Sequence, residues 1–471
     1  MGEAGHRQGM FSRRLFSNGL KKARLPAGET VVFTRPVNRY CLIWLLMNLP
    51  WLYTRLWSVA PFLIRRYLRK RAKKNPAYLA HWDERFGSSF SGAVQNPIWI
   101  HAVSVGETRA ALPLVRELRC FFPETPILMT QMTPTGRETA RALFPDVQCR
   151  YLPYDKPEYI KQFLEEHRPV FGVLMETEIW PNLMHGCRAH GVPLFLANAR
   201  LSEKSQKGYL HIRTLVEPAM QTLSGCYAQT ADDAERLHLI GASNVHVCGN
   251  TKYDVTPPPE AEKRAAEFRE RIGSRPVVVC GSTRFYKGED EAEMLLKAWR
   301  SYRGDALLVV VPRHPERFQE VYDTAQSLGF KVQKRSDGEP VDKSTQVWVG
   351  DSMGELFAYF LAADIAFIGG SLVDAGCQNV IESIACNVPT LFGPSTYNFA
   401  EVCRSAVAAG AAKQIGSAEE WLTMTRFWLA DKQERQQYAD AASAFVRRHR
   451  GASARMAELI SEAVQERLKK V

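Results

Sequence analysis

Several motifs that are common in nucleotide-binding and hydrolytic enzymes are missing from this sequence. It has no Walker lysine motif, no G-x-G-x-x-G fingerprint and no G-x-S-x-G element. Its ten cysteines are scattered, without a C-x-x-C pair, and some lie in apolar runs such as the one that ends at Cys280. These absences argue against a disulfide framework and a zinc site, and we expect reduced cysteines in a cytosolic body. No His, Cys or Asp cluster has metal spacing, so no metal or other cofactor is expected.

Positive charge is in excess, with a formal net charge of +11. Such a balance suits nucleic acid, anionic lipid or phosphorylated substrates, and its distribution decides among them. The densest cluster directly follows an apolar stretch and consists of Arg65, Arg66, Arg69, Lys70, Arg71, Lys73 and Lys74. This placement predicts an anionic membrane surface as a partner and no nucleic acid.

The N-terminal region lacks an uninterrupted apolar run of the ~20 residues that a spanning helix needs. Residues 1–36 are a polar basic tail, and apolar character extends over 40–53 and 56–64, broken by Arg55 and two prolines. No cleavage site follows. We expect 37–74 to be either a short uncleaved anchor or an interfacial helix with Trp44, Trp51 and Trp57 at the boundary. A buried core helix is the alternative. Either membrane placement puts the rest of the chain on the cytoplasmic side of the membrane.

From Pro97 onward, short β-branched runs alternate with helical patterns, which predicts parallel sheets covered by helices on both faces. The prolines 257–259 cannot continue a helix or a central strand, so the linker between two domains is placed there. The predicted fold is α/β, with two doubly wound Rossmann-like domains facing a cleft. The expected boundaries are 75–255 for the first domain, 256–274 for the linker, 275–440 for the second domain and 441–471 for a C-terminal helix.

Polar side chains gather where the predicted strands of the first domain end. Glu107 follows the strand 98–101 at the start of a helix, where a carboxylate either caps the helix or acts as a general base. Glu176 and Glu178 follow the strand 170–174, and strict alternation places both side chains on the same face of the sheet. We expect one of them to enter the site and the other to form an ion pair. Arg200 and Lys252 follow two further predicted strands, 193–196 and 245–248, and would place positive charge near these carboxylates or near a phosphate.

The second domain has comparable strand ends. Gly281-Ser282-Thr283 precedes a helix expected near Gly288 and offers hydroxyls and backbone N–H groups to a phosphate. Arg313 ends a buried strand, and its guanidinium suits a phosphate. Glu382 lies three residues after Asn379, so the pair either contacts ribose hydroxyls or forms a capping box.

Together these segments resemble the transferases of 3-deoxy-D-manno-octulosonic acid (Kdo). The resemblance covers about residues 40–405, in the family's order. It rests on Ser104–Glu107, Met132–Gly136, Tyr151–Asp155, Met175–Glu178 with Trp180–Asn182, Asn198–Ser202, Pro312–Phe318, Gly350–Leu356 and Gly369–Leu372.

The resemblance implies a GT-B glycosyltransferase that moves Kdo from CMP-Kdo to a lipid A precursor, lipid IV(A), with inversion and without a metal. It implies that Glu107 is the catalytic base and that Glu176 and Lys252 stabilise the transition state. It further implies that the CMP-binding residues are Pro312, Arg313, Met353, Gly354, Glu355, Asn379, Val380, Ile381 and Glu382. Many members have a histidine where this chain has Gln378, which leaves any role of that imidazole open.

Other functions share this architecture, because a fold alone does not fix a function. A relative of lipid A disaccharide synthase or of UDP-GlcNAc 2-epimerase would keep the two domains with another donor. A non-catalytic membrane scaffold would keep the fold and lose the carboxylates, whereas Glu107, Glu176 and Glu382 are present.

Overall fold

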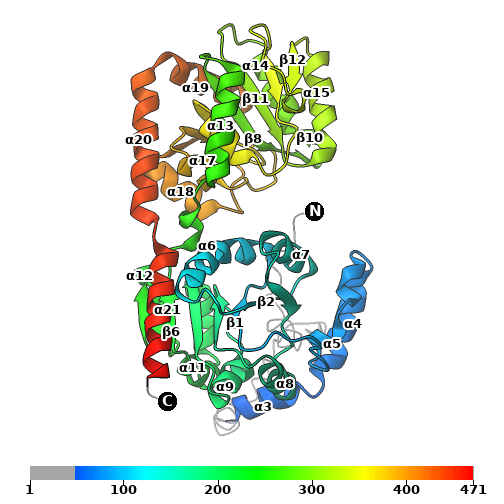
Figure 1. Cartoon of the computed structure of the whole chain (residues 1–471), viewed down its shortest axis with the longest axis vertical. Coiled ribbons are helices and arrows are strands. Elements are labelled where there is room, and N and C mark those ends of the chain that lie inside the picture. The colour runs from blue at the N-terminus through cyan, green and yellow to red at the C-terminus, as the bar shows by residue number, and fades with distance from the viewer. Residues whose placement is uncertain (1–47, 470–471) are drawn as a thin grey trace, which may run out of the picture. The chain divides into compact units, whose positions relative to one another are not determined.

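The computed structural model describes residues 48–469, so the predictions for residues 1–36 and for Trp44 lie outside the described residues. The chain forms two compact units (Figure 1). The N-terminal unit comprises the described parts of Tyr40–Thr256 and of Val446–Val471, and the C-terminal unit comprises Pro257–Phe445. The predicted two-domain α/β architecture with parallel sheets is confirmed.

The N-terminal unit is built on a seven-stranded parallel sheet of order β3-β2-β1-β4-β5-β6-β7. Its strands are β1 (Ile98–His101), β2 (Ile127–Gln131), β3 (Gln148–Tyr151), β4 (Phe171–Met175), β5 (Leu194–Ala199), β6 (Gly225–Ala228) and β7 (Val245–Val247). The central strands are buried on both sides, which explains their continuous apolar sequences.

Alternate residues of each strand feed two cores on opposite faces of this sheet. Ile98 and Ile100 lie in the core that α6, α7 and α21 cover, and Trp99 lies in the core under α8, α9, α11 and α12. The helices of the unit's body are α6 (Val105–Phe121), α7 (Pro134–Leu143), α8 (Pro157–His167), α9 (Pro181–Ala189), α10 (Glu203–Leu210), α11 (Arg213–Met220), α12 (Ala231–Leu239), the 3₁₀ helix η3 (Thr251–Asp254) and α21 (Ala452–Leu468).

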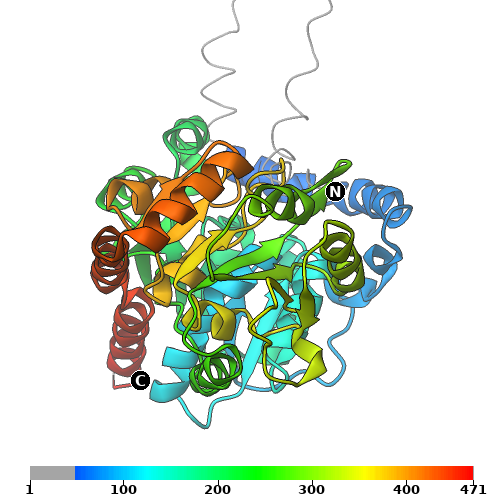
Figure 2. The same ribbon diagram turned by 90° about the horizontal axis from the view of Figure 1, so that it is seen from above.

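Short helices precede the first strand. They are α3 (Leu49–Leu56), α4 (Ala60–Ala72), η2 (Pro76–Leu79) and α5 (Trp82–Arg85). Within residues 48–469, no helix is both long enough and apolar enough to cross a bilayer. Viewed along two directions, α4 and α21 lie on opposite sides of the N-terminal unit (Figures 1 and 2).

The C-terminal unit repeats the architecture with a seven-stranded parallel sheet of order β12-β13-β11-β8-β14-β15-β16. Its strands are β8 (Val277–Thr283), β11 (Leu307–Pro312), β12 (Val332–Lys334), β13 (Val347–Val349), β14 (Ile365–Ile368), β15 (Thr390–Phe392) and β16 (Ala412–Gln414), beside a separate hairpin of β9 (Phe285–Tyr286) and β10 (Glu289–Asp290). The helix expected near Gly288 begins later, at Glu291, because this hairpin comes first.

Helices cover both faces of this second sheet. They are α13 (Pro259–Ile272), α14 (Glu291–Trp299), η4 (Pro315–Arg317), α15 (Phe318–Ser327), η5 (Arg335–Asp337), α16 (Leu356–Leu361), α17 (Val380–Ala385), α18 (Ala400–Ala408), α19 (Ala418–Ala430) and α20 (Lys432–His449). The range 256–274, expected as a linker, contains α13, whose apolar side buries Ala265 and Phe268. The prolines end at its first turn, where a missing N–H is tolerated.

The chain returns to the N-terminal unit within α20, and α21 then packs beside α6. Asp254 fixes this return, because its carboxylate accepts hydrogen bonds of 2.6 Å from the N–H groups of Gly451 and Ser453 at the start of α21.

Candidate active site

The strand order of the N-terminal unit reverses between β1 and β4, which are hydrogen-bonded neighbours. β2 and β3 follow on one side of β1, and β5, β6 and β7 follow on the far side of β4. The loops after two such strands diverge, and in doubly wound sheets this switch point is where ligands bind. Glu107 follows β1, and Glu176 and Glu178 follow β4, so the topology brings three carboxylates to one place.

Glu107 is the third residue of α6 and folds back over the turn that joins β1 to this helix. Its Oε2 accepts a hydrogen bond of 2.7 Å from the backbone N–H of Val103, and its Oε1 accepts one of 2.9 Å from the Ser104 hydroxyl. The side chain thus caps the helix start as the simpler interpretation expected. It is only partly buried, so a capping carboxylate and an accessible base coexist in one residue.

Gly106 lies directly before Glu107 in the first turn of α6. Its backbone lies in α6 without a positive φ, so no left-handed conformation requires glycine. A Cβ atom there would meet nothing closer than Ser104 Oγ at 4.0 Å. Gly106 is exposed beside Glu107, and its missing side chain leaves space next to the carboxylate.

The pKa of Glu107 is raised to about 7. Burial is the main cause and the nearby charge of Glu176 adds to it, while the hydrogen bonds from Val103 and Ser104 and the charge of Lys252 act in the opposite direction. A carboxyl group with such a pKa is ionised for much of the time near neutral pH and is still basic enough to take up a proton.

The loop after β2 supports the Glu107 turn. The Thr133 hydroxyl donates to the carbonyl oxygen of Val103 at 3.3 Å and accepts from the N–H of Gly136 at 3.1 Å, capping α7. A Cβ atom on Gly136 would lie 2.8 Å from Thr133 Oγ1 and 3.2 Å from the carbonyl oxygen of Val103. Glycine at this position therefore allows α7 to approach the turn.

Glu176 stands at a break in the strand. Its φ of +59° is left-handed, so the predicted alternation ends at Met175 and does not carry on through Glu178. The carboxylate lies between two cations, with Oε1 3.5 Å from Lys252 Nζ and Oε2 3.6 Å from Arg200 Nε. Of the two glutamates after β4, Glu176 is therefore the ion-paired one.

Lys252 is placed by a chain of amide side chains. The Asn250 side chain accepts from the Lys252 N–H at 2.9 Å and donates to Gln229 Oε1 at 3.0 Å. Gln229 Nε2 donates to the Asn198 carbonyl oxygen at 2.9 Å, and Asn198 Oδ1 accepts from the Thr251 N–H at 3.1 Å. The ends of β5 and β6 thereby hold η3 and its lysine toward Glu176.

Glu178 has no lysine or arginine within ion-pair distance in the described part of the chain. Its Oε2 accepts a hydrogen bond of 2.7 Å from the indole N–H of Trp180. Burial is the main cause that raises the pKa of Glu178 to about 8, and the charges of Glu107 and Glu176 raise it further. The sequence pattern did not separate this glutamate from Glu176.

A buried carboxylate ties α3 to the same region. Asp155 accepts from the Tyr53 hydroxyl at 2.7 Å and from the N–H groups of Asn182 and Leu183 at 3.1 and 2.7 Å. The Thr54 hydroxyl also donates to Asn182 Oδ1 at 3.0 Å. Through Asp155 and Asn182, α3 is therefore anchored on the first turn of α9, a contact with no local sequence signal.

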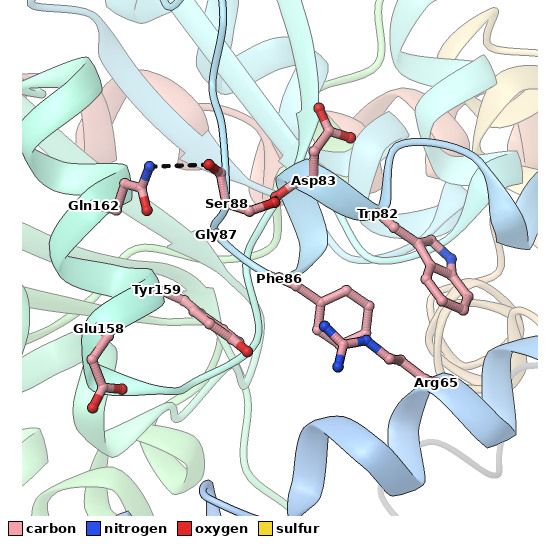
Figure 3. Close-up of a pocket in the computed structure, with 9 residues that line it drawn as sticks. All are labelled: Arg65, Trp82, Asp83, Phe86, Gly87, Ser88, Glu158, Tyr159 and Gln162. Carbon is pink, nitrogen blue, oxygen red and sulfur yellow. Dashed lines mark hydrogen bonds between the residues drawn. The ribbon is translucent and has the colours of Figure 1, made fainter.

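A separate pocket of about 420 Å³ lies between α4, α5 and α8 (Figure 3). Aromatic side chains and a guanidinium form much of it, with the Arg65 guanidinium carbon 4.3 Å from the centre of the Phe86 ring. The lining residues are Arg65, Trp82, Asp83, Phe86, Gly87, Ser88, Glu158, Tyr159 and Gln162. It contains none of the three carboxylates at the switch point.

In the C-terminal unit, Pro312 and Arg313 stand where β11 ends beside β8. The Arg313 N–H donates to the Thr283 carbonyl oxygen at 3.0 Å, and a register shift falls at Pro312 opposite Thr283. Ser282 has a φ of +59°, so the predicted turn at 281–283 is an irregular continuation of β8 and not a turn before a helix.

Met353, Gly354 and Glu355 precede α16 and differ in exposure. Met353 is 53% exposed, and a Cβ atom on Gly354 would meet no neighbour within 4 Å. Glu355 is buried, and its carboxylate accepts two hydrogen bonds of 2.8 Å from Arg335 as well as bonds from Arg264 and Ser352. A ligand of this segment can therefore contact the exposed Met353 and the backbone of Gly354, whereas the Glu355 carboxylate is buried and already hydrogen-bonded.

Asn379 is the N-cap of α17, with Oδ1 accepting from the Ile381 N–H at 3.2 Å. Its Nδ2 donates to Glu382 Oε1 at 3.1 Å, so the reciprocal bond uses the amide side chain where a capping box would use the backbone N–H. Val380 and Ile381 are buried, while Asn379 and Glu382 are partly exposed. The two polar residues are the members of this segment that a ligand can reach.

Glu291 is the first residue of α14. It is fully buried, and its carboxylate accepts from the N–H groups of Arg284, Gly370, Ser371 and Leu372 at 3.1, 2.6, 3.0 and 2.9 Å. These bonds fix the glycine-containing loop after β14 to the end of β8. No group of His, Cys, Asp and Glu in residues 48–469 is arranged to hold a metal ion.

This chain is similar to one family of known proteins. A family profile described as "3-Deoxy-D-manno-octulosonic-acid transferase (kdotransferase)" matches residues 80–255, the range that contains Glu107, Glu176 and Lys252. The 3-deoxy-D-manno-octulosonic acid transferase of Bordetella pertussis is 38% identical over 80% of this chain and 90% of its own length. That of Haemophilus influenzae is 35% identical over 87% of this chain and 97% of its own length.

Among solved structures, a UDP-GlcNAc 2-epimerase from Neisseria meningitidis has a TM-score of 0.50 and 14% identity, over 79% of this chain and 100% of that chain. This likeness concerns the fold alone.

Proposed function

Because this chain belongs to the family of 3-deoxy-D-manno-octulosonic acid (Kdo) transferases, and is therefore a glycosyltransferase, we propose that it is a GT-B enzyme that moves Kdo from CMP-Kdo to the lipid A precursor lipid IV(A), with inversion. One observation carries the proposal. At the switch point of the N-terminal sheet, a half-buried carboxyl group with a pKa of about 7 lies beside the ion-paired Glu176 and Lys252.

The transfer requires a base, and Glu107 is that base. Its carboxylate accepts the proton of an acceptor hydroxyl while the hydroxyl oxygen forms a bond to the anomeric carbon of Kdo. The bond from that carbon to the phosphate oxygen breaks, and CMP leaves with the bonding electrons. Attack on the face opposite the leaving group gives inversion. Gly106 leaves space beside the carboxylate for the acceptor.

Glu176 and Lys252 form a pair of opposite charges next to the base. As positive charge develops on the sugar ring and negative charge on the departing phosphate, fixed charges that need no reorganisation lower the barrier. Arg200 gives Glu176 a second cation. Their roles are those of transition-state stabilisers.

CMP-Kdo binds to the ends of the strands of the C-terminal unit. Arg313 at the end of β11 provides donors for the phosphate, Met353 and Gly354 are accessible before α16, and Asn379 and Glu382 offer an amide and a carboxylate to hydroxyls. Glu291 fixes the neighbouring loop. A monophosphate leaving group carries less charge than a diphosphate, so these protein groups are sufficient without a metal.

The acceptor is a lipid, and the enzyme works at the cytoplasmic face of the inner membrane. Solvent-exposed apolar side chains lie on α3, on α4 and just before α4, with Trp51 56%, Phe62 69% and Val59 60% exposed. Arg66, Arg69, Lys70, Lys73 and Lys74 are exposed on or just after α4. Apolar groups that insert and cations that meet anionic headgroups are the two elements of interfacial binding.

Mass spectrometry of the product lipid tests this function. The detergent-solubilised protein is incubated with CMP-Kdo and lipid IV(A), and Glu107→Gln is the control. A gain of whole Kdo units by the lipid with the unaltered chain alone is the expected result. No gain, together with tight binding of UDP and none of CMP, would point to a UDP-sugar enzyme. No gain and no nucleotide binding by folded protein would point to a scaffold.

A further inference from the structure

The carboxylates at the switch point are more numerous than the cations that face them. Glu107 follows β1, and Glu176 and Glu178 follow the neighbouring strand β4. The three carboxyl groups are close enough for their charges to interact, and Lys252 and Arg200 both lie against Glu176. Among residues 48–469, two of these carboxylates are left without an ion-pair partner, Glu107 on α6 and Glu178 after β4. Like charges held close together in a partly dehydrated site do not both ionise near neutral pH, so the two share one proton.

The hydrogen bonds decide which member of the pair holds this proton. Glu107 accepts from the Val103 N–H and the Ser104 hydroxyl, and it stands in the first turn of a long helix, where negative charge is favoured. Glu178 accepts from the neutral indole N–H of Trp180. The ionised form is therefore better supported at Glu107 than at Glu178.

The other titratable and charged groups around Glu178 do not reverse this order. Tyr209 on α10 senses the charge of Glu178, and its own pKa is raised, mainly by burial, so it stays neutral. Glu176 is negative and disfavours ionisation of Glu178, and Lys252 acts on Glu107 in the direction that favours its charge. Arg200 faces Glu176.

We propose that Glu178 is a positioning residue that holds the proton of the Glu107–Glu178 pair, and thereby leaves Glu107 ionised and able to accept the proton of the acceptor hydroxyl. The proposal rests on the proposed function of Glu107 as the base. A neutral Glu178 also leaves two carboxylates against two cations, so the site does not repel an anionic sugar nucleotide. An ionised Glu178 would add a net negative charge there.

Infrared spectroscopy locates the proton without any substrate. Spectra of the unaltered protein and of Glu178→Gln and Glu107→Gln are compared at about pH 7.5, between the pKa values of about 7 and about 8 of the two groups. Glu166→Gln, on the exposed side of α8, is the matched control. In Glu178→Gln, the absorption of protonated carboxyl groups should lose the contribution of one group. In Glu107→Gln that contribution should be kept and should titrate at a lower pH, because the charge of Glu107 raises the pKa of Glu178. Asp155 and Glu291, whose pKa values are raised to about 7 mainly by burial, contribute equally to all of these spectra. Loss of that contribution in Glu107→Gln with its retention in Glu178→Gln would overturn the proposal.

The pH dependence of kcat/KM for the donor gives the second test. Glutamine is a permanently neutral equivalent of protonated glutamate and can still accept from Trp180. Glu178→Gln should lose the decline at higher pH, while the decline at lower pH stays in place. An unchanged alkaline decline, or a loss of activity in a folded Glu178→Gln protein, would contradict the proposal.

The two tests separate this inference from the proposed function. If Glu107→Gln transfers Kdo at the normal rate, the base assignment fails, and the proposal about Glu178 fails with it. If Glu107→Gln is inactive and the infrared band does not depend on Glu178, the base assignment stands and the inference alone is wrong.

Discussion

Lys252 Nζ lies 3.5 Å from Glu176 Oε1, and this pair joins η3, which follows β7, to the end of β4. Lys252 is also the cation that lowers the pKa of Glu107, against the larger effects of burial and of Glu176. The lysine therefore influences the base as well as its own ion-pair partner. The charges at the switch point act as one coupled set, and substitutions there should change the pH dependence of transfer.

Replacing Lys252 by methionine should raise the pKa of Glu107, because a positive charge that favours its ionised form is removed. We expect the acidic decline of the pH–rate profile to move to higher pH and kcat to fall by roughly 10- to 100-fold. Arg200→Met is the matched control, since Arg200 faces Glu176 from the exposed side and does not contribute to the pKa of Glu107. An equal shift in both variants would contradict a specific role of Lys252.

Glu107→Gln should make the protein more stable at alkaline pH. The pKa of Glu107 is raised from 4.5 to about 7 in the folded chain, so its favourable contribution to folding is complete below 4.5 and is lost as the pH rises through 7. A neutral glutamine avoids this loss. We expect a gain of roughly 1–2 kcal/mol at pH 8 and little change at pH 4.5, measured by thermal unfolding. An equal gain at both pH values would show that ionisation of Glu107 is not the cause.

Gly106→Ala separates stability from activity. The backbone conformation of Gly106 is open to any residue, and alanine in a helix loses less conformational entropy on folding, so stability should rise by about 0.4–1 kcal/mol. A bulkier Gly106→Val should fill the space beside Glu107 and raise the KM of the acceptor. Thermal unfolding and kinetics on the same preparations check both statements. Full activity of Gly106→Val would mean that the acceptor does not approach past this position.

Tyr53→Phe tests the attachment of α3. The variant removes one hydrogen bond to the buried Asp155 and leaves the N–H groups of Asn182 and Leu183 in place. We expect a loss of about 1–2 kcal/mol and faster proteolysis before residue 60. Tyr67→Phe is the matched control, because Tyr67 is exposed and its hydroxyl accepts from Arg71 on the surface of α4. Equal proteolysis of the two variants would contradict the anchoring role of Asp155.

The exposed side chains of α3 and α4 should determine membrane binding. Phe62→Ser should weaken flotation with anionic vesicles by roughly tenfold, since a buried phenylalanine side chain contributes about 1.5–3 kcal/mol. Phe427→Ser on α19 is the matched control, with 46% of Phe427 exposed. Binding should also decrease with neutral lipid and at high salt. Identical flotation of both variants would argue against a membrane contact through α4.

The parallel architecture and the position of Glu107 at the edge of the sheet could be predicted from the sequence, because both follow from local patterns. Apolar runs such as Val277–Cys280 are strands in any context that buries both faces, and a glutamate after such a run lies at the edge of the sheet where sites form. The short strands β3 and β6 could not be recognised in the sequence. Gln148–Tyr151, which forms β3, has no continuous apolar run, and Gly225–Ala228, which forms β6, begins only a few residues after the end of α11.

The remaining features depend on contacts between distant residues. Nothing near Tyr53 indicates that its hydroxyl meets Asp155, 102 residues away. Alternation suggested a common direction for Glu176 and Glu178, but the left-handed φ of Glu176 ends the strand and gives the cations to Glu176 alone. The four backbone N–H groups that Glu291 binds are likewise contributed by loops after two other strands of the chain.

The rate of Kdo transfer by Glu107→Gln, relative to the unaltered chain at saturating CMP-Kdo and lipid IV(A), tests the central claim most directly. The account predicts a fall in kcat of roughly 10²–10⁴-fold, the range of a lost general base, with CMP binding and thermal stability retained. A folded Glu107→Gln protein that transfers Kdo within a few-fold of the normal rate would contradict it.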